Sequence, residues 1–180
     1  MKTLATELPG VLLIEPQVFG DDRGFFYESW NARAFEAAGV PVTFVQDNHS
    51  RSAANVLRGL HYQLRRPQGK LVRVIAGEVF DVVVDLRRSS PSFGKWTGLR
   101  LSAQDKHILW IPPGFAHGFL VTSDSAELLY KATDYWVPED ERTIAWNDSD
   151  LAIDWPLQSQ PVLSAKDARG VPLARAETYP

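Results

Sequence analysis

The chain has 180 residues, a formal net charge of −3 and no cysteine. The missing cysteines exclude disulfides, thiolate nucleophiles and cysteine-ligated zinc, and they suit a reducing compartment. The slight negative charge argues against a nucleic-acid partner held by a basic face. The apolar run near the N-terminus covers only residues 11–14, far short of a membrane span, so we expect a cytoplasmic protein without a membrane partner. The length is that of one domain, residues 1–180.

Most of the predicted elements are strands. One helix is expected over residues 31–39, with Asn31 as its N-cap and Gly39 as its stop signal. Runs rich in β-branched and aromatic residues, separated by Gly and Pro, predict strands at 70–77, 78–87, 96–102, 107–113, 118–123 and 126–136. A short helical turn is expected near residues 164–167.

Alternation with a period of two is clearest in residues 78–87. Phe80, Val82 and Val84 share one face of that strand, and Asp81 falls on the other. Many short strands with almost no helix predict a mostly β fold, an antiparallel jelly roll or barrel with a few short helices. The alternation fits other antiparallel folds as well and does not choose among them.

Two segments resemble the two halves of a cupin site. Metal-binding cupins offer His-x-His, a Glu and a Gly, whereas this chain offers His61, Gln63, Lys70 and Gly77. The second half, Pro-x-Gly-x-x-His, is matched by residues 112–117 and ends at His117. An ammonium has three donors and no acceptor, so a lysine in the carboxylate position repels a cation. We therefore predict no metal site.

The same cavity is expected to collect Arg58, His61, Lys70, His117 and Tyr130. A base, a cation and a phenol in one barrel mouth suit proton abstraction beside a carbonyl, followed by return of a proton. Each residue also has an ordinary structural explanation, since a strand His or Tyr can simply be packed and Arg or Lys can be solvated. A metal cupin dioxygenase or isomerase and a non-enzymatic sugar-binding jelly roll remain alternatives at this point.

At these residues the chain resembles the dTDP-4-dehydrorhamnose 3,5-epimerase family, from about Gly10 to Pro172. The resemblance rests on DDRGFFYESW, FVQDNHSRS, NVLRGLHYQ, QGKLVRVIAGEVFDVVVDLR, SPSFGKW, IPPGFAHGFLVTSDSAELLYKATDYW, PEDERTIAWND and LSAKD. It implies a homodimer of cupin jelly rolls without metal or organic cofactor. The implied reaction inverts C3 and C5 of a 4-keto sugar attached to dTDP, a step of dTDP-L-rhamnose synthesis.

The resemblance also implies roles for single residues. His61 is matched to the proton acceptor, with the Asp167 carboxylate orienting its imidazole. Tyr130 is matched to the proton donor on the opposite sugar face, and Lys70 to a cation near the C4 oxygen. Further residues are matched to contacts with the nucleotide, the phosphates or the sugar: Phe19, Arg23, Phe26, Glu28, Gln46, Asp47, Asn48, Arg58, His117, Glu141 and Lys166.

Three expectations go with these roles. Part of the thymidine diphosphate site, including Arg23 and Phe19, is implied to come from the neighbouring subunit. Strand parity puts Asp81 on the cavity face, where we expect it to orient His117. Trp136 stands where family members often have Tyr, which keeps a stacking surface but removes a hydroxyl. A mono-epimerase acting at C3 or C5 alone is therefore the nearest alternative, because the same His61–Tyr130 pair would serve it.

Overall fold

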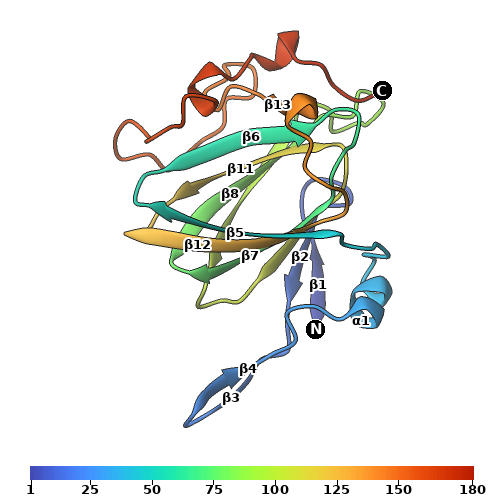
Figure 1. Cartoon of the computed structure of the whole chain (residues 1–180), viewed down its shortest axis with the longest axis vertical. Helices are drawn as coiled ribbons and strands as arrows, with labels where there is room; N and C mark the ends of the chain where they lie inside the picture. Colours follow the sequence, from blue (N-terminus) through green and yellow to red (C-terminus); the bar gives the residue numbers. More distant parts are fainter.

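The computed structural model describes residues 1–180, and antiparallel strands form most of its regular secondary structure (Figure 1). The strands are β1 Lys2–Ala5, β2 Leu12–Glu15, β3 Phe19–Asp21, β4 Gly24–Phe26, β5 Gln46–Ala53, β6 Leu57–Gln63, β7 Lys70–Ala76, β8 Glu78–Asp85, β9 Trp96–Ser102, β10 Ile108–Ile111, β11 Phe115–Val121, β12 Ser125–Ala132 and β13 Glu141–Thr143. One α-helix, α1 Ala32–Ala37, and three 3₁₀ turns, Pro138–Asp140, Asp167–Arg169 and Leu173–Arg175, complete the chain. None of these helices has the length and apolar character needed to cross a bilayer.

Two antiparallel sheets face each other and form the jelly-roll barrel. The six-stranded sheet has the order β1-β2-β10-β7-β12-β5, and the five-stranded sheet has the order β13-β6-β11-β8-β9. Figure 1 shows β6, β11 and β8 lying over β5, β12 and β7. The prediction of a mostly β jelly roll with a few short helices is confirmed.

Three hydrophobic clusters hold the layers together. The first lies between the sheets and joins Val72, Val83, Leu109 and Phe119 with other side chains from both sheets. The second covers the outer face of the five-stranded sheet with the C-terminal segment, and the third covers the six-stranded sheet with α1. Both faces of β8 are therefore buried. Each apolar side chain removed from water contributes about 1.5–3 kcal/mol, so this layered burial fixes the barrel that carries the site.

The predicted helix is confirmed, with α1 running inside residues 31–39. The Asn31 side chain accepts a hydrogen bond from the Ala34 amide at 3.2 Å, which satisfies a free donor of the first turn. Gly39 ends it at a φ of +91°, a conformation that costs little only for glycine.

Several predicted strand boundaries were wrong; the strand expected over 118–123, for example, is β11 and begins at Phe115. The strand expected over 126–136 ends at Ala132, and residues 133–136 leave the sheet. The helical turn expected near 164–167 is present, since the Ala168 amide donates to Ser164 O at 3.0 Å and a 3₁₀ turn follows at Asp167–Arg169. Period-two patterns and turn propensities locate an element better than they locate its ends, because pairing across the sheet decides where a strand stops.

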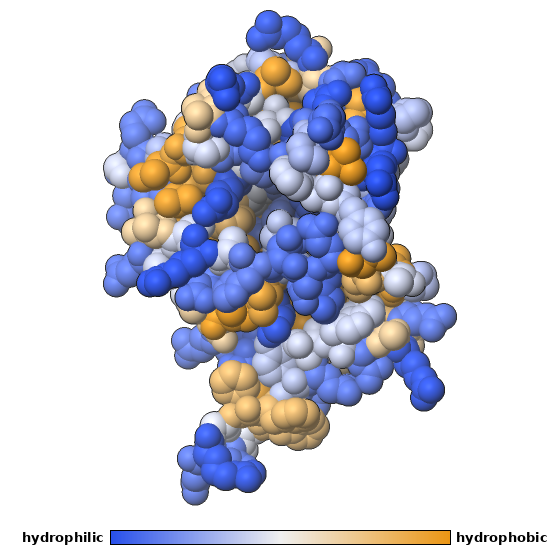
Figure 2. Space-filling model, viewed as in Figure 1, coloured by the Kyte–Doolittle hydropathy of each residue, from blue (hydrophilic) through white to orange (hydrophobic).

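A hairpin of β3 and β4, which we call the arm, projects away from the barrel (Figure 1). Its aromatic side chains are exposed, with Phe19 at 60%, Phe25 at 64% and Phe26 at 68% of their accessible surface. Figure 2 shows an apolar patch where this projection adjoins the body of the molecule and a hydrophilic tip beyond it. Large aromatic rings left in water are unusual for a lone chain and indicate a contact surface.

Candidate active site

A cavity of about 250 Å³ opens between the two sheets. It is lined by Ser50, Arg58, His61, Lys70, His117, Gly118, Phe119, Leu128, Tyr130, Trp136, Glu141 and Lys166. The sequence-based cluster of Arg58, His61, Lys70, His117 and Tyr130 is thus brought together, with Trp136, Glu141 and Lys166 at the same cavity. Ser50, Gly118, Phe119 and Leu128 were not predicted. Strand parity carried a signal for Phe119, two residues from His117, and for Leu128, two residues from Tyr130.

Arg58 and His61 share this cavity although they are three residues apart on β6. In a regular strand an odd spacing puts two side chains on opposite faces. Here the register of β6 against β11 shifts between the pairs His117–His61 and Phe119–Arg58. Gly59 makes the shift possible, because a Cβ there would lie 2.5 Å from Gly118 Cα. The irregularity turns both side chains inward.

His61 and Asp167 form a tightly held pair. His61 Nε2 lies 2.5 Å from Asp167 Oδ1, and Ser164 Oγ donates to Asp167 Oδ2 at 2.6 Å. Burial alone would raise the pKa of Asp167, but the hydrogen bonds from His61 and Ser164 outweigh burial and lower that pKa to about 2. Asp167 is therefore ionised near neutral pH and can only accept hydrogen bonds.

The state of His61 follows from this partner. Burial lowers the pKa of His61, and the hydrogen bond with Asp167 opposes that change only in part. The imidazole is thus neutral near pH 7, with its single proton on Nε2 facing the carboxylate. Nδ1 keeps a free lone pair. A neutral imidazole held in one tautomer is the arrangement expected of a general base.

Lys70 and Tyr130 reach the cavity from the opposite, six-stranded sheet. Burial lowers the pKa of Lys70 to about 8, and the charges of Glu141 and Asp81 oppose this only partly. Lys70 still carries its proton at pH 7. Burial raises the pKa of Tyr130, with Glu141 adding to the effect, so its phenol stays protonated. A cation and an acid therefore face the His61 base across the cavity.

His117 lies opposite His61 in the β6–β11 register and is almost fully buried. Its Nε2 lies 2.9 Å from both carboxylate oxygens of Asp81 on β8. The expected contact between Asp81 and His117 is thus present. No group of three or more His, Asp or Glu side chains has the arrangement of a metal site.

Glu141 and Lys166 form an ion pair at the same cavity, with the Lys166 ammonium 2.9 Å from Glu141 Oε1. Arg58 is held by Ser52 Oγ, to which its Nε donates at 2.9 Å. Trp136 lies at the edge of the cavity with 52% of its surface exposed. Three cationic side chains therefore line one cavity: Arg58, Lys70 and Lys166. Such a group of cations suits a ligand that carries phosphate groups.

The remaining predicted contact residues do not line this cavity. On β5, Gln46 donates to Asn48 Oδ1 at 3.0 Å, while Asp47 points outward and pairs with Lys131 at 2.9 Å. Glu28 accepts a hydrogen bond from Asn31 at 3.0 Å.

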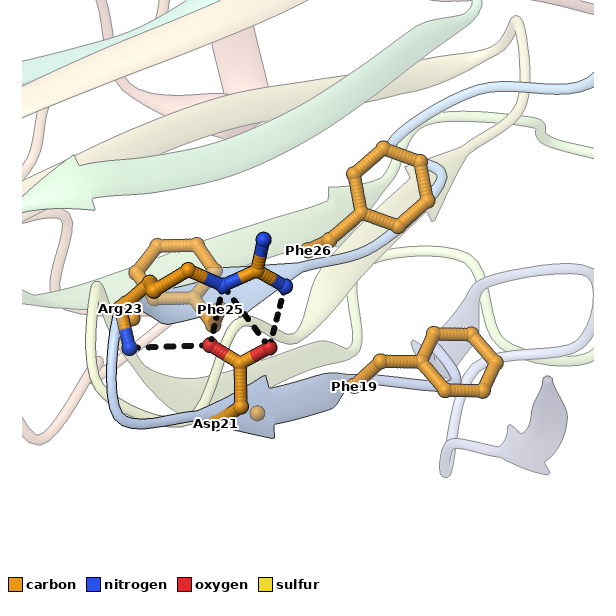
Figure 3. A pocket seen from close by; sticks show the side chains of 7 residues that line it. Phe19, Asp21, Arg23, Phe25 and Phe26 are labelled. Atoms are coloured by element: carbon orange, nitrogen blue, oxygen red, sulfur yellow. Dashed lines mark hydrogen bonds and ion pairs between the residues drawn. The ribbon is translucent and has the colours of Figure 1, made fainter.

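The predicted contact residues on the arm also lie away from the cavity. Figure 3 shows the Arg23 guanidinium against Asp21, with the rings of Phe19 and Phe26, which are paired across the two strands, at the right of the view. The arm has a concave side of its own, about 310 Å³ in volume.

Comparison with known proteins decides the family. The sequence model of the dTDP-4-dehydrorhamnose 3,5-epimerase family matches residues 5–175. The chain is 65% identical to a dTDP-4-dehydrorhamnose 3,5-epimerase of Pseudomonas aeruginosa over 100% of both chains. The chain belongs to the dTDP-4-dehydrorhamnose 3,5-epimerase family.

Solved structures of this epimerase family share the fold over nearly the whole chain. An epimerase from Legionella pneumophila, solved with dTDP-4-keto-L-rhamnose, has a TM-score of 0.95 and 52% identity, covering 98% of this chain and 94% of its own. A 3′-monoepimerase from Streptomyces bikiniensis, solved with dTDP-quinovose, has a TM-score of 0.89 and 32% identity, covering 94% of this chain and 86% of its own. Inversion at one carbon and inversion at two therefore occur on one fold.

Proposed function

We propose that this protein is an isomerase that converts dTDP-4-dehydro-6-deoxy-D-glucose into dTDP-4-dehydro-L-rhamnose, a step of dTDP-L-rhamnose biosynthesis. The observation that carries the proposal is the cavity itself, in which a neutral His61 on one sheet faces Tyr130 on the other. The high identity to a relative named as a 3,5-epimerase supports two inversions over one. The whole chain, residues 1–180, acts as a single epimerase domain.

The reaction needs a proton removed from one face of the sugar and another returned to the opposite face. C3 and C5 both flank the C4 ketone, so loss of either proton gives an enolate with its negative charge on O4. His61 Nδ1 takes the proton, with the charged imidazolium stabilised by Asp167. The Lys70 ammonium stabilises the O4 charge in a site partly shielded from water. Tyr130 then donates its phenolic proton to the same carbon, which inverts it.

The cationic rim supports binding of the diphosphate. Arg58, with its Nε fixed by Ser52, leaves other guanidinium N–H groups for phosphate oxygens. His117, Lys166 and Glu141 are placed to contact the sugar and its phosphates, and Trp136 offers a flat apolar surface to the base. None of these roles requires a metal or an organic cofactor. Cytoplasmic location stays a prediction.

Turnover in heavy water tests the function directly. The wild type should convert the keto-sugar nucleotide and place deuterium at both C3 and C5, because each inverted carbon receives its proton from a group that exchanges with solvent. Proton NMR of the product measures both positions. Label at one carbon alone would make the protein a mono-epimerase, the second candidate that the Streptomyces bikiniensis relative illustrates.

We also propose that the protein acts as a homodimer in which each arm completes the nucleotide site of its neighbour. The arm carries Phe19, Arg23 and Phe26 away from its own cavity and leaves their rings exposed (Figures 1 and 3). Its charged tip and aromatic sides suit a nucleoside diphosphate, which presents phosphates and a flat base. A second copy related by two-fold symmetry would receive the arm and give its own in return.

Subunit mixing tests this arrangement. Inactive His61→Asn chains mixed with inactive Arg23→Ala chains should regain about a quarter of wild-type activity, because random pairing gives one complete site in half of the dimers. The matched control mixes His61→Asn with Tyr130→Phe. Both of those changes fall in the cavity of a single chain, so no mixed dimer contains a complete site. Failure of the first mixture after proven subunit exchange would mean that each site is built within one chain.

A further inference from the structure

The segment that joins β12 to β13, residues 133–140, crosses from one sheet to the other beside the cavity. We call it the strap. It carries Trp136, whose indole lines the cavity while half of its surface remains exposed. With half of its surface exposed, the indole is held only in part by packing, so the position of the backbone on either side also determines where the ring lies.

Gln63 supplies that fixation from β6. Its side-chain amide donates to Tyr135 O at 3.2 Å and to Arg66 O at 2.8 Å, and its Oε1 accepts from the Val137 amide at 2.6 Å. The peptide groups before and after Trp136 are thus bound by one side chain. Gln63 is only 3% exposed and does not line the cavity. A buried amide with three satisfied hydrogen bonds is costly to replace.

A second glutamine holds the Trp136 peptide from the other sheet. Gln46 Oε1, on β5, accepts from the Trp136 amide at 2.9 Å. The far end of the strap is held as well, because the Asp140 carboxylate accepts from the amides of Arg65 and Arg66 at 2.7–2.9 Å. Two glutamines from opposite sheets therefore hold the backbone on both sides of the indole.

Residue 63 is the second position of the His-x-His pattern that metal cupins use for ligands. A neutral imidazole has one donor and one acceptor, so a histidine could not make the three bonds that Gln63 makes. We propose that Gln63 is a positioning residue that fixes the Trp136 indole over the cavity mouth and so sets affinity for the nucleotide, without taking part in proton transfer. The inference rests on the proposed function, since it takes dTDP as the nucleotide.

The kinetic expectation is a split between binding and chemistry. Gln63→Ala should raise KM for the sugar nucleotide about tenfold and leave kcat within about twofold, because stacking on the indole is made equally in the ground state and the transition state. Gln63→Glu keeps the shape and the acceptor for Val137 but removes both donors, so it should show the same split. Gln104→Ala, on an exposed turn, is the control and should behave as the wild type. Near-UV circular dichroism verifies that each variant is folded.

A double-mutant cycle on dTDP binding, measured by calorimetry without turnover, is decisive. Gln63→Ala and Trp136→Ala should each weaken dTDP about tenfold, and the double variant should be no weaker than Trp136→Ala alone. The inference would be overturned if Gln63→Ala weakened dTDP binding by the same factor in the wild type and in the Trp136→Ala variant. It would also be overturned if Gln63→Ala lowered kcat and left dTDP affinity unchanged. Either result would leave the proposed function standing. A wild-type protein that does not bind dTDP at all would overturn both.

Discussion

His61→Asn should abolish turnover, with a loss of at least about a thousandfold in kcat. His61 is neutral at pH 7, keeps a free lone pair on Nδ1 and is oriented by the buried Asp167 carboxylate. Asparagine is similar to histidine in size, and its side-chain N–H can still donate a hydrogen bond to Asp167. Its amide oxygen accepts no proton in this pH range, so the pair keeps its packing and loses its base.

The same variant should also stop exchange of the substrate's α-protons with solvent. Exchange requires only proton removal, so measuring deuterium uptake by NMR separates the base from every later step. His49→Asn is the matched control, because His49 also pairs with a carboxylate, Glu127, at 2.9 Å, but on an exposed surface. That variant should keep wild-type exchange and turnover. Persistent exchange in His61→Asn would remove His61 from the mechanism.

The sequence was sufficient to predict the elements that are determined by a local pattern of residues. Alternation in residues 78–87 predicted which side chains of β8 share a face, and Val83 with Asp81 lies inside the barrel as that pattern requires. Asn31 and Gly39 bounded α1 because capping and left-handed backbone are properties of single residues. The cavity cluster followed from spacing and family resemblance together.

Features that depend on contacts across the fold could not be predicted. The shift at Gly59 that turns Arg58 and His61 to one face is a property of two paired strands, not of β6 alone. The end of β12 at Ala132 depends on where its partners stop. The orientation of Gln63 toward the strap is decided by backbone groups more than seventy residues away in the chain, which no local pattern reveals. Long-range pairing is where single-residue propensities carry least information.

The proposed roles of Lys70, His61 and Tyr130 also explain how one cavity can serve two carbons. In the proposed mechanism Lys70, which lines the cavity, stabilises O4, and O4 is common to the enolates formed from C3 and from C5. The proposed base, His61, and the proposed acid, Tyr130, stand on different sheets. In the proposed mechanism, selection between one and two inversions would depend on how freely the sugar turns in the cavity.

Tyr130→Phe should separate the two halves of the reaction. The variant loses only the hydroxyl, so the ring keeps its place on β12, where residue 130 is paired with Asn48 on β5 and with Val72 on β7. His61 and Asp167 are untouched and can still remove a proton, so solvent exchange into the substrate should continue at a substantial rate. Return of a proton on the opposite face has no donor, and we expect inverted product to fall by about a hundredfold to a thousandfold.

The measurement is one time course in heavy water, followed by NMR for deuterium in recovered substrate and for inverted product. Tyr62→Phe is the control, since it loses a hydroxyl bonded to Glu177 O on the outer face of the same barrel and should keep both exchange and inversion. Because burial raises the pKa of Tyr130, the wild-type phenol remains protonated through neutral pH and the contrast between the variants should not depend on pH there. If Tyr130→Phe lost both exchange and inversion, the phenol would act before or during proton removal. If the variant, which lacks the phenolic hydroxyl, still inverted the sugar fully, the proton donor would lie elsewhere in the cavity.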